Sequence, residues 1–238
     1  MCVVLGAGEY YGCAIDVPDG ALVIAADGGW DHARAAGVRV DLLVGDFDSI
    51  DADDDVDRLG VGTLRLPTQK DDPDLLTALK VGWLKGARTF HLYGCLGGRV
   101  DHSLSAVQLA ALVASRGGVA FLHGDGQVVT AVTDGALQFA GGHVDGPVSV
   151  FAHSDTARGV CEPGLRYELQ DATMSNLMVN GVSNEFIDGR AATVSVREGT
   201  LTVVFPAAAP LPTVTHTHAF DGDLGEVSTE VSAVLVRS

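Results

Sequence analysis

The sequence predicts an α/β protein, with an N-terminal doubly wound, mostly parallel sheet and a C-terminal antiparallel β-sandwich. Short, almost wholly apolar segments alternate with helical patterns over residues 1–123, as in a doubly wound fold. Beyond residue 124, short strands of alternating polarity follow one another without an amphipathic helix. Hydrophobic residues make up 47% of the 238 residues, which is enough for two packed domains.

Six segments in the first half are predicted to form the parallel sheet. They are rich in branched apolar residues and almost uninterrupted by polar ones, which is typical of strands that are covered on both faces. The segments are CVVLG (2–6), ALVIAA (21–26), DLLVG (41–45), GTLRL (62–66), TFHLY (89–93) and VAFLH (119–123).

Helical patterns lie between several of these strands. SIDADDDVDRL (49–59) opens with Ser49 as a candidate N-cap and has acidic residues in its first turns. DPDLLTALKVGWLKG (72–86) has Asp72 at the cap position and Pro73 at the first helical position. DHSLSAVQLAALVASRGG (101–118) ends in glycines suited to a helix C-terminus. In such a fold, the chemistry is expected at the carboxyl ends of the strands.

The second half has the pattern of an antiparallel sandwich. Its predicted strands are QVVTAV (127–132), GALQFA (135–140), GPVSVFA (146–152), AATVSVR (191–197) and GTLTVVF (199–205). We therefore place domain boundaries after residues 124 and 206. Residues 207–238 are predicted to be a stiff, proline-containing linker and a tail that could add a hairpin.

Charge and cysteine usage exclude several classes of partner. The chain carries 31 acidic against 15 basic residues, a net charge of −16, which disfavours nucleic acid and anionic membranes as partners. Its four cysteines show no C-x-x-C spacing, as expected of reduced thiols in a cytoplasmic protein. The N-terminal residues show no export signal, and no apolar run approaches the ~20 residues of a membrane helix.

Two aspartates follow the third predicted strand, in the segment LLVGDFDSI (42–50). Asp46 and Asp48 are two residues apart, so in an extended chain both carboxylates can converge on one point. A hard divalent cation such as Mg²⁺ would remove their mutual repulsion. The alternative is that they cap the helix predicted from Ser49 and solvate a loop, since D-x-D is common in turns.

A second acidic cluster, KDDPD (70–74), follows the next strand and places Lys70 beside Asp71, Asp72 and Asp74. Asp72 has an alternative function as the N-cap that precedes Pro73. Asp74 lies one position inside the predicted helix, where its carboxylate could interact with either the helix dipole or a metal ion.

A third cluster, GCLGGRVDHS (94–103), combines glycines with one arginine and one aspartate. Glycines allow a backbone to approach phosphate closely, and arginine can bind phosphate bidentately. The alternative is a glycine-rich turn that only serves tight geometry. Because all three clusters follow strands of one predicted sheet, we expect a crevice for phosphate and metal at its edge.

The order of these motifs resembles the thiamin pyrophosphokinase family. The motifs are AADGGWD (25–31), GDFDSI (45–50), KDDPDLLTAL (70–79), GGRVDH (97–102), GLRYEL (164–169) and GVSNEF (181–186). The resemblance implies an α/β catalytic domain over residues 1–124 and a thiamin-binding β-sandwich over residues 125–206. It further implies a homodimer with active sites between subunits, and transfer of diphosphate from ATP to thiamin with release of AMP.

The resemblance also implies roles for individual residues. The metal and phosphate carboxylates would be Asp46, Asp48 and Asp74. Arg99 would contact phosphate, and Asp101 would support it or help to deprotonate the attacking hydroxyl. The other residues implied at the phosphates of ATP are Asp27, Lys70, Asp71, Gly97 and Gly98. Those implied at thiamin are Tyr167, Ser183 and Asn184, which on the sequence alone could equally be a sandwich-core aromatic and a turn.

Two positions depart from the family pattern, and two other functions stay open. Pro73 stands where the family commonly has threonine, and Ala106 lies near the position of a common asparagine. One open function is a related diphosphokinase that acts on another primary alcohol, such as 6-hydroxymethylpterin. The other is a non-catalytic sensor that binds thiamin or a nucleotide.

Overall fold

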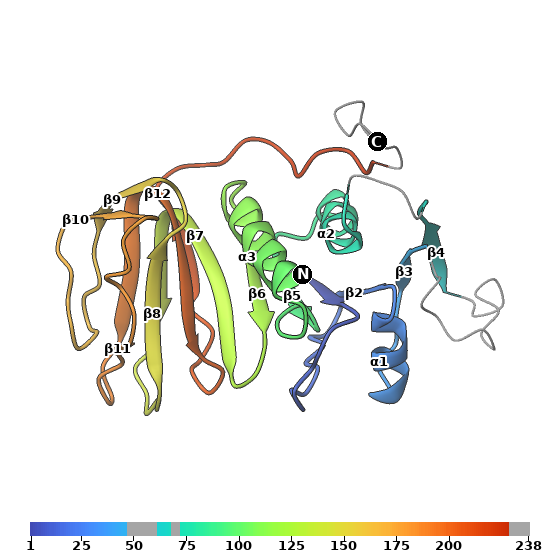
Figure 1. Ribbon diagram of the computed structural model, residues 1–238, viewed down its shortest axis with the longest axis horizontal. Coiled ribbons are helices and arrows are strands. Elements are labelled where there is room, and N and C mark those ends of the chain that lie inside the picture. The colour runs from blue at the N-terminus through green and yellow to red at the C-terminus, as the bar shows by residue number, and fades with distance from the viewer. Residues whose placement is uncertain (47–60, 68–71, 229–238) are drawn as a thin grey trace.

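The computed structural model describes residues 1–46, 61–67 and 72–228. Figure 1 shows parallel strands with their helices on one side of the molecule and long antiparallel strands on the other. In the described part of the chain, no helix is both long enough and apolar enough to cross a membrane. The helix predicted over residues 49–59 lies outside the described residues.

The parallel sheet has the strand order β6-β5-β1-β2-β3-β4, and each predicted segment of the first half forms one of its strands. The strands are β1 (Cys2–Leu5), β2 (Leu22–Ala26), β3 (Leu42–Gly45), β4 (Gly62–Arg65), β5 (Thr89–Tyr93) and β6 (Val119–His123). β1 lies between β2 and β5, so the chain winds outwards from it in both directions. The doubly wound fold predicted from the sequence is confirmed.

Helices cover both faces of this sheet. On one face, Val3 and Leu5 of β1 pack with Trp30 of α1 (Gly29–Ala35), a helix that the sequence patterns did not predict. On the other face, Val4 packs in one core with Leu79 of α2 (Asp74–Leu84), and α3 (Val100–Ala114) covers the same core. The alternation of side chains along β1 therefore supplies both cores.

The start of α2 differs from the sequence-based prediction. Pro73 is the N-cap, with φ −57° and ψ 149°, and the first helical residue is Asp74. Asp72 does not cap the helix, because its carboxylate binds Lys80 instead, with an oxygen–nitrogen distance of 2.5 Å. The cap position predicted for Asp72 was therefore wrong by one residue.

Antiparallel strands form the second half. They are β7 (Gln127–Phe139), β8 (Pro147–Ala152), β9 (Thr156–Val160), β10 (Ala172–Ser175), β11 (Asn184–Glu185), β12 (Ala192–Pro206) and β13 (Thr213–His216). β7 and β12 are each one long strand where the sequence predicted two. A register shift between Val196 and Thr200 absorbs the interruption, and the backbone N–H of Gly199 donates to the Asp134 carboxylate at 2.7 Å. The polar and glycine residues between the predicted strand pairs therefore form a β-bulge-like irregularity within β7 and β12, and not a hairpin turn.

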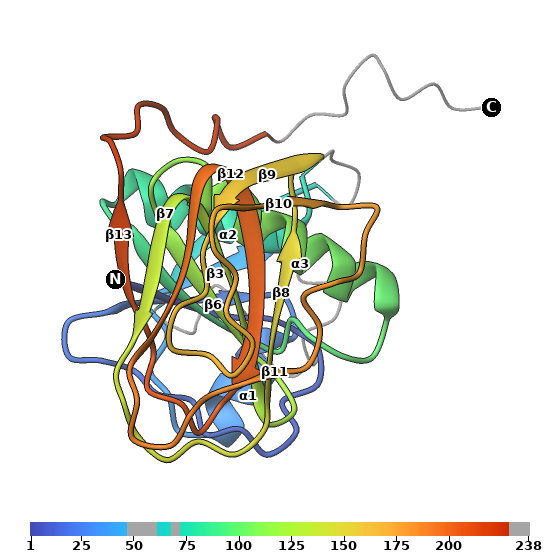
Figure 2. The same ribbon diagram turned by 90° about the vertical axis from the view of Figure 1, so that its left-hand side faces the viewer.

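The two halves share hydrogen-bonded strands. β6 pairs with β7 in antiparallel fashion, with Leu122 opposite Val129, so the sheet continues across residue 124. The described tail adds one strand, β13, beside β7 instead of a separate hairpin. From β13 the tail runs over the top of the molecule towards α2 (Figures 1 and 2).

The close approach of α1 to β1 generates a stability prediction. A Cβ atom at Gly29 would lie 2.0 Å from the backbone oxygen of Leu5, so Gly29→Ala must move the helix away from the strand. We expect the free energy of unfolding, measured with urea, to fall by about 1–3 kcal/mol. Gly142→Ala is the matched control, because no atom lies within 4 Å of its added Cβ. Equal stability of the two variants would contradict this account of the packing.

Candidate active site

A cavity of about 720 Å³ lies at the carboxyl end of the parallel sheet. Its walls are the loops after β1 (residues 6–9) and β2 (26–27), the start of α2 (72–75), and the loop after β5 with the start of α3 (94–105). β1 and β5 are neighbours whose connections leave in opposite directions, which is where ligands bind in open α/β sheets. The crevice expected from the sequence is therefore present, and its described lining comes from the first half of the chain.

Carboxylates gather at this edge of the sheet. Asp27 follows β2 and lines the cavity, its backbone N–H donating to Val44 of the adjacent β3 at 3.0 Å. Its carboxylate lies directly against Gly45, where a side chain would collide with it. Asp46 comes next, half-buried at the end of β3. Asp48, Lys70 and Asp71 lie outside the described residues, so their predicted roles stay predictions.

The helix starts contribute the other side of the cavity. Asp74, the first residue of α2, lines it together with Pro73. α3 begins just after the glycine turn, and both helices direct their N-terminal ends at the same space. Backbone N–H groups at helix N-termini attract phosphate, because the helix dipole is positive there.

The glycine turn holds Arg99 at the cavity. Gly97 and Gly98 have φ angles of +87° and +64°, a backbone region that favours glycine, and the Gly97 N–H donates to the Ser103 hydroxyl at 2.9 Å. The Arg99 guanidinium binds Asp101 bidentately, with Nε–Oδ1 at 3.1 Å and Nη2–Oδ2 at 2.6 Å. The Arg99 side chain is still 71% exposed, so much of the guanidinium faces solvent and can meet an anion.

Protonation states at the cavity limit which groups can act as bases or nucleophiles. The hydrogen bond from Arg99 lowers the pKa of Asp101, so this carboxylate is ionised and is a weak proton acceptor. Burial raises the pKa of the Cys95 thiol to about 12, which leaves it protonated at neutral pH. Neither Asp101 nor Cys95 is therefore suited to act as a strong base at neutral pH.

The described lining is chemically suited to a hard cation, although the described residues alone form no complete metal cluster. Asp27 and Asp74 supply the oxygen ligands that Mg²⁺ prefers. Among residues 1–46, 61–67 and 72–228, no three His, Cys, Asp or Glu side chains converge on one point. Mg²⁺ usually takes only one or two protein carboxylates, with water and phosphate completing its shell.

The residues predicted at thiamin lie together in the sandwich, and no described residue beyond Ser105 lines the cavity. Asn184 is buried, and its amide makes several bonds. Its Oδ1 accepts from the backbone N–H of Tyr167 at 3.0 Å, and its Nδ2 donates to the Tyr167 carbonyl at 2.8 Å and to Glu162 Oε2 at 3.0 Å. Asn184 thus fixes the backbone of Tyr167, a residue that is 65% exposed.

Ser183 stands next to this network in a left-handed conformation. Its φ is +61°, its side chain is exposed, and its backbone N–H donates to the Ser149 hydroxyl at 3.1 Å. The preceding loop is unusually apolar for a surface. Its exposed apolar residues are Leu177, Met178, Val179 and Val182.

Three features of the site were not found from the sequence. Glu162 is only 2% exposed, and its Oε1 has no hydrogen-bond partner. Only its place two residues before the GLRYEL motif could have indicated it. Gly8 lines the cavity within GAGEY (6–10), where two glycines after the first strand were the available signal. Asp72 also lines the cavity, although its sequence position indicated a helix cap.

A doubly wound sheet with carboxylates, a glycine turn and an arginine at its switch point is typical of enzymes that bind phosphorylated substrates. The family profile for the catalytic domain of thiamin pyrophosphokinase matches residues 18–119, and the profile for its vitamin B1 binding domain matches residues 145–201. Because these matches together cover more than half of the chain, it belongs to the thiamin pyrophosphokinase family. Its activity is that of a diphosphotransferase, a thiamine diphosphokinase.

Solved structures support the fold. The chain is similar to thiamine pyrophosphokinase from Bacillus subtilis, with a TM-score of 0.77 and 21% identity over 87% of this chain and 100% of that one. It is also similar to the Geobacillus thermodenitrificans protein, with a TM-score of 0.72 and 24% identity over 87% and 98%. For thiamin pyrophosphokinase from Candida albicans the TM-score is 0.68 and the identity 13%, over 86% and 88%. No curated protein sequence matches the chain.

Glu162 generates a pH-dependent prediction. Burial raises its pKa, so the folded state holds the proton more tightly than the unfolded chain does. Protonation of Glu162 therefore stabilises the folded state fully at pH values below the ordinary carboxyl pKa. This stabilisation is lost as the pH rises through the raised pKa of Glu162 in the folded state. Glu162→Gln should be more stable than the unsubstituted protein at about pH 8, and the difference should shrink towards about pH 4.

Urea unfolding at a series of pH values measures this difference. Glu198→Gln is the control, because the Glu198 side chain is 67% exposed and should show no such trend. A stability difference for Glu162→Gln that does not change with pH would contradict a buried, protonated carboxyl group.

Proposed function

We propose that the cavity binds ATP and that its β- and γ-phosphates pass as one diphosphate group to the hydroxyl of thiamin, with release of AMP. The observation that carries this proposal is the cavity itself. It lies at the switch point within the part of the chain that matches the catalytic domain, and Asp27, Asp74 and Arg99 line it.

In this proposal the chain acts by neutralising and orienting the phosphates. The N-termini of α2 and α3 and the outer side of Arg99 face the cavity, so they would bind phosphate oxygens. Gly97 and Gly98 keep the backbone close to the nucleotide. Asp101 orients Arg99, since its lowered pKa makes it a poor base for the attacking alcohol. Stabilising charge that develops at phosphorus is the main catalytic effect such a site can supply.

We further propose that Asp27, Asp46 and Asp74, with Asp48, hold Mg²⁺. The observation in favour is the donor chemistry, since the described members are carboxylates at one edge of the sheet. When bound, the ion would neutralise phosphate charge and keep the carboxylates from repelling the nucleotide. Lys70 and Asp71 would stand at the same phosphates, as the KDDPD motif suggests.

Thiamin would bind at the sandwich. Tyr167 presents an exposed aromatic face, and thiamin is a cation that such a face attracts. Asn184 keeps Tyr167 in place, and Ser183 offers a hydroxyl beside it. The net charge of −16 favours a cationic substrate over a neutral pterin.

The separation of the two groups of residues favours a shared active site. No described residue of the sandwich lines the cavity, so thiamin at Tyr167 of one chain would not reach ATP in the cavity of that chain. A homodimer in which the sandwich of each chain faces the cavity of the other would bring them together. The exposed loop of Leu177, Met178 and Val179 would be covered in such an assembly. We place this dimer in the cytoplasm, where its cysteines would be reduced.

A product assay tests the substrate assignment. With Mg²⁺ and ATP, the protein should form AMP with thiamin but not with 6-hydroxymethylpterin. AMP formed only with the pterin would identify the related diphosphokinase, and thiamin binding without AMP from any alcohol would identify a sensor.

Asp74→Asn and Asp48→Asn should lose most turnover at an unchanged melting temperature. Asp145→Asn is the control, since that side chain is 91% exposed and is not among the described residues that line the cavity.

Mixed dimers test whether the site is shared. When Asp74→Asn and Tyr167→Ala are carried by separate chains, a purified heterodimer should regain about half of the activity, because one of its two sites is intact. When both substitutions are in one chain that is paired with an unsubstituted chain, each shared site has one defect and activity should be lost. Sites within single chains would give the opposite pair of results.

A further inference from the structure

The C-terminal tail returns to the catalytic half of the chain. After β13 it crosses to α2 and α3, where Leu224 is 6% exposed and packs in the core that contains Leu79. The Nε of Arg116, at the end of α3, donates to the carbonyl of Asp223 at 3.0 Å. The matches to the family profiles end at residue 201, so this segment is additional to the matched domains.

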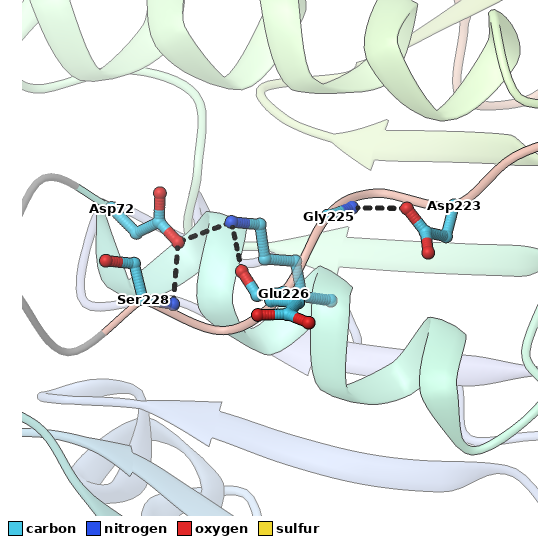
Figure 3. A network of polar contacts seen from close by, with 6 residues as sticks. Asp72, Asp223, Gly225, Glu226 and Ser228 are labelled. Atoms are coloured by element: carbon cyan, nitrogen blue, oxygen red, sulfur yellow. Dashed lines mark hydrogen bonds and ion pairs between the residues drawn. The ribbon is translucent and has the colours of Figure 1, made fainter.

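Lys80 connects the tail to the cavity. Its Nζ donates to Asp72 Oδ2 at 2.5 Å and to the carbonyl of Glu226 at 2.8 Å, and the backbone N–H of Ser228 approaches the same Asp72 oxygen at 3.4 Å. Figure 3 shows Asp72, Glu226 and Ser228 converging on these contacts. Asp72 belongs to the cavity wall, so a series of polar contacts connects the tail to the candidate active site.

The burial of this ion pair requires an explanation. The Lys80 side chain is 9% exposed and that of Asp72 13%. A buried ion pair contributes little net stability, because desolvation offsets much of the attraction. Apolar side chains of similar size would usually stabilise α2 at least as well. The ion pair does hold Lys80 and Asp72 in a fixed relative position. If either side chain moved away, the other would be left as a buried charge without its partner.

The geometry it fixes is the start of α2. Asp72 is turned towards Lys80, and Pro73, which follows it, caps the helix without a side-chain hydrogen bond. Asp74 comes next and enters the cavity. The position of Asp74 therefore depends on a turn that is held through Asp72 by Lys80 and the tail.

We propose that residues 220–228 form a strap that, through Lys80 and Asp72, holds Asp74 in its position at the cavity. Lys80 is a positioning residue, and the strap is part of the active-site architecture. The inference rests on the proposed function in one respect only, that Asp74 serves the phosphates of ATP.

Two substitutions break the connection at different points. Lys80→Met removes the charge and keeps the stem that packs in the protein. Leu224→Asp releases the strap without touching Lys80 or the cavity. The matched controls are Lys85→Met, an exposed lysine at the end of the same helix, and Leu211→Asp, where the leucine is 41% exposed near the start of the tail.

Hydrogen exchange in the full chain gives a readout independent of activity. Both Lys80→Met and Leu224→Asp should speed amide exchange at Thr77, whose N–H donates to the Pro73 carbonyl at 3.1 Å, and at the residues of the next turn of α2, and neither control should. Exchange that increases only within residues 220–228 of Leu224→Asp would overturn the proposal, because the strap would then not hold the helix. If Lys80→Met fails to fold, Leu224→Asp still decides the result.

Kinetics separates positioning from a general structural role. The KM for ATP should rise, or kcat should fall, by about ten- to a hundredfold in Lys80→Met and Leu224→Asp, since small displacements of a catalytic group cost that much. The KM for thiamin should change little, and Lys80→Arg should restore part of the loss. Unchanged kinetics in a folded Lys80→Met would overturn the inference while leaving the proposed function intact. Absence of AMP formation by the unsubstituted protein would instead refute the proposed function, and hydrogen exchange would still decide on the strap.

Discussion

The central position of β1 between β2 and β5 is the constraint on which the rest of the structure depends. Parallel strands that are wound outwards from a central strand leave their following loops at one edge, and neighbouring connections diverge there. That divergence opens the cavity, whose described walls are the segments after β1, β2 and β5 and the starts of α2 and α3. The packing of both faces of β1 against helices keeps this edge in a fixed shape.

Electrostatics at the cavity follows from the same arrangement. Helix N-termini and Arg99 bring positive potential to a strongly acidic protein at the place where carboxylates also gather. Positive groups and carboxylates close together in one cavity are suited to a ligand that combines phosphate with a bound cation, because each can interact with the part of opposite charge. Ala106, on the third helix of this half, is fully buried, so a polar side chain at this position would need its own hydrogen-bond partners.

Much of this could be predicted from the sequence, for physical reasons. The parallel strands were found because burial on both faces makes them almost wholly apolar, and α2 and α3 because they are long enough to show a period. α1 was missed because it spans only seven residues and opens with glycine. The long strands β7 and β12 were divided because a β-bulge and a turn use the same residues. The burial of Glu162 and the contact of Lys80 with the tail depend on residues distant in sequence, which local patterns do not encode.

The pairing of β6 with β7 has a consequence for how such a chain can change over time. Backbone hydrogen bonds join β6 and β7, the strands on either side of residue 124. Each half therefore depends on the other to pair the backbone groups of its strand at this boundary. A cut at this point would expose two unpaired strand edges, which are prone to aggregate. The catalytic and vitamin-binding halves are therefore poor modules for exchange between relatives, since a recombined chain would have to preserve the register of Leu122 opposite Val129 as well as each domain.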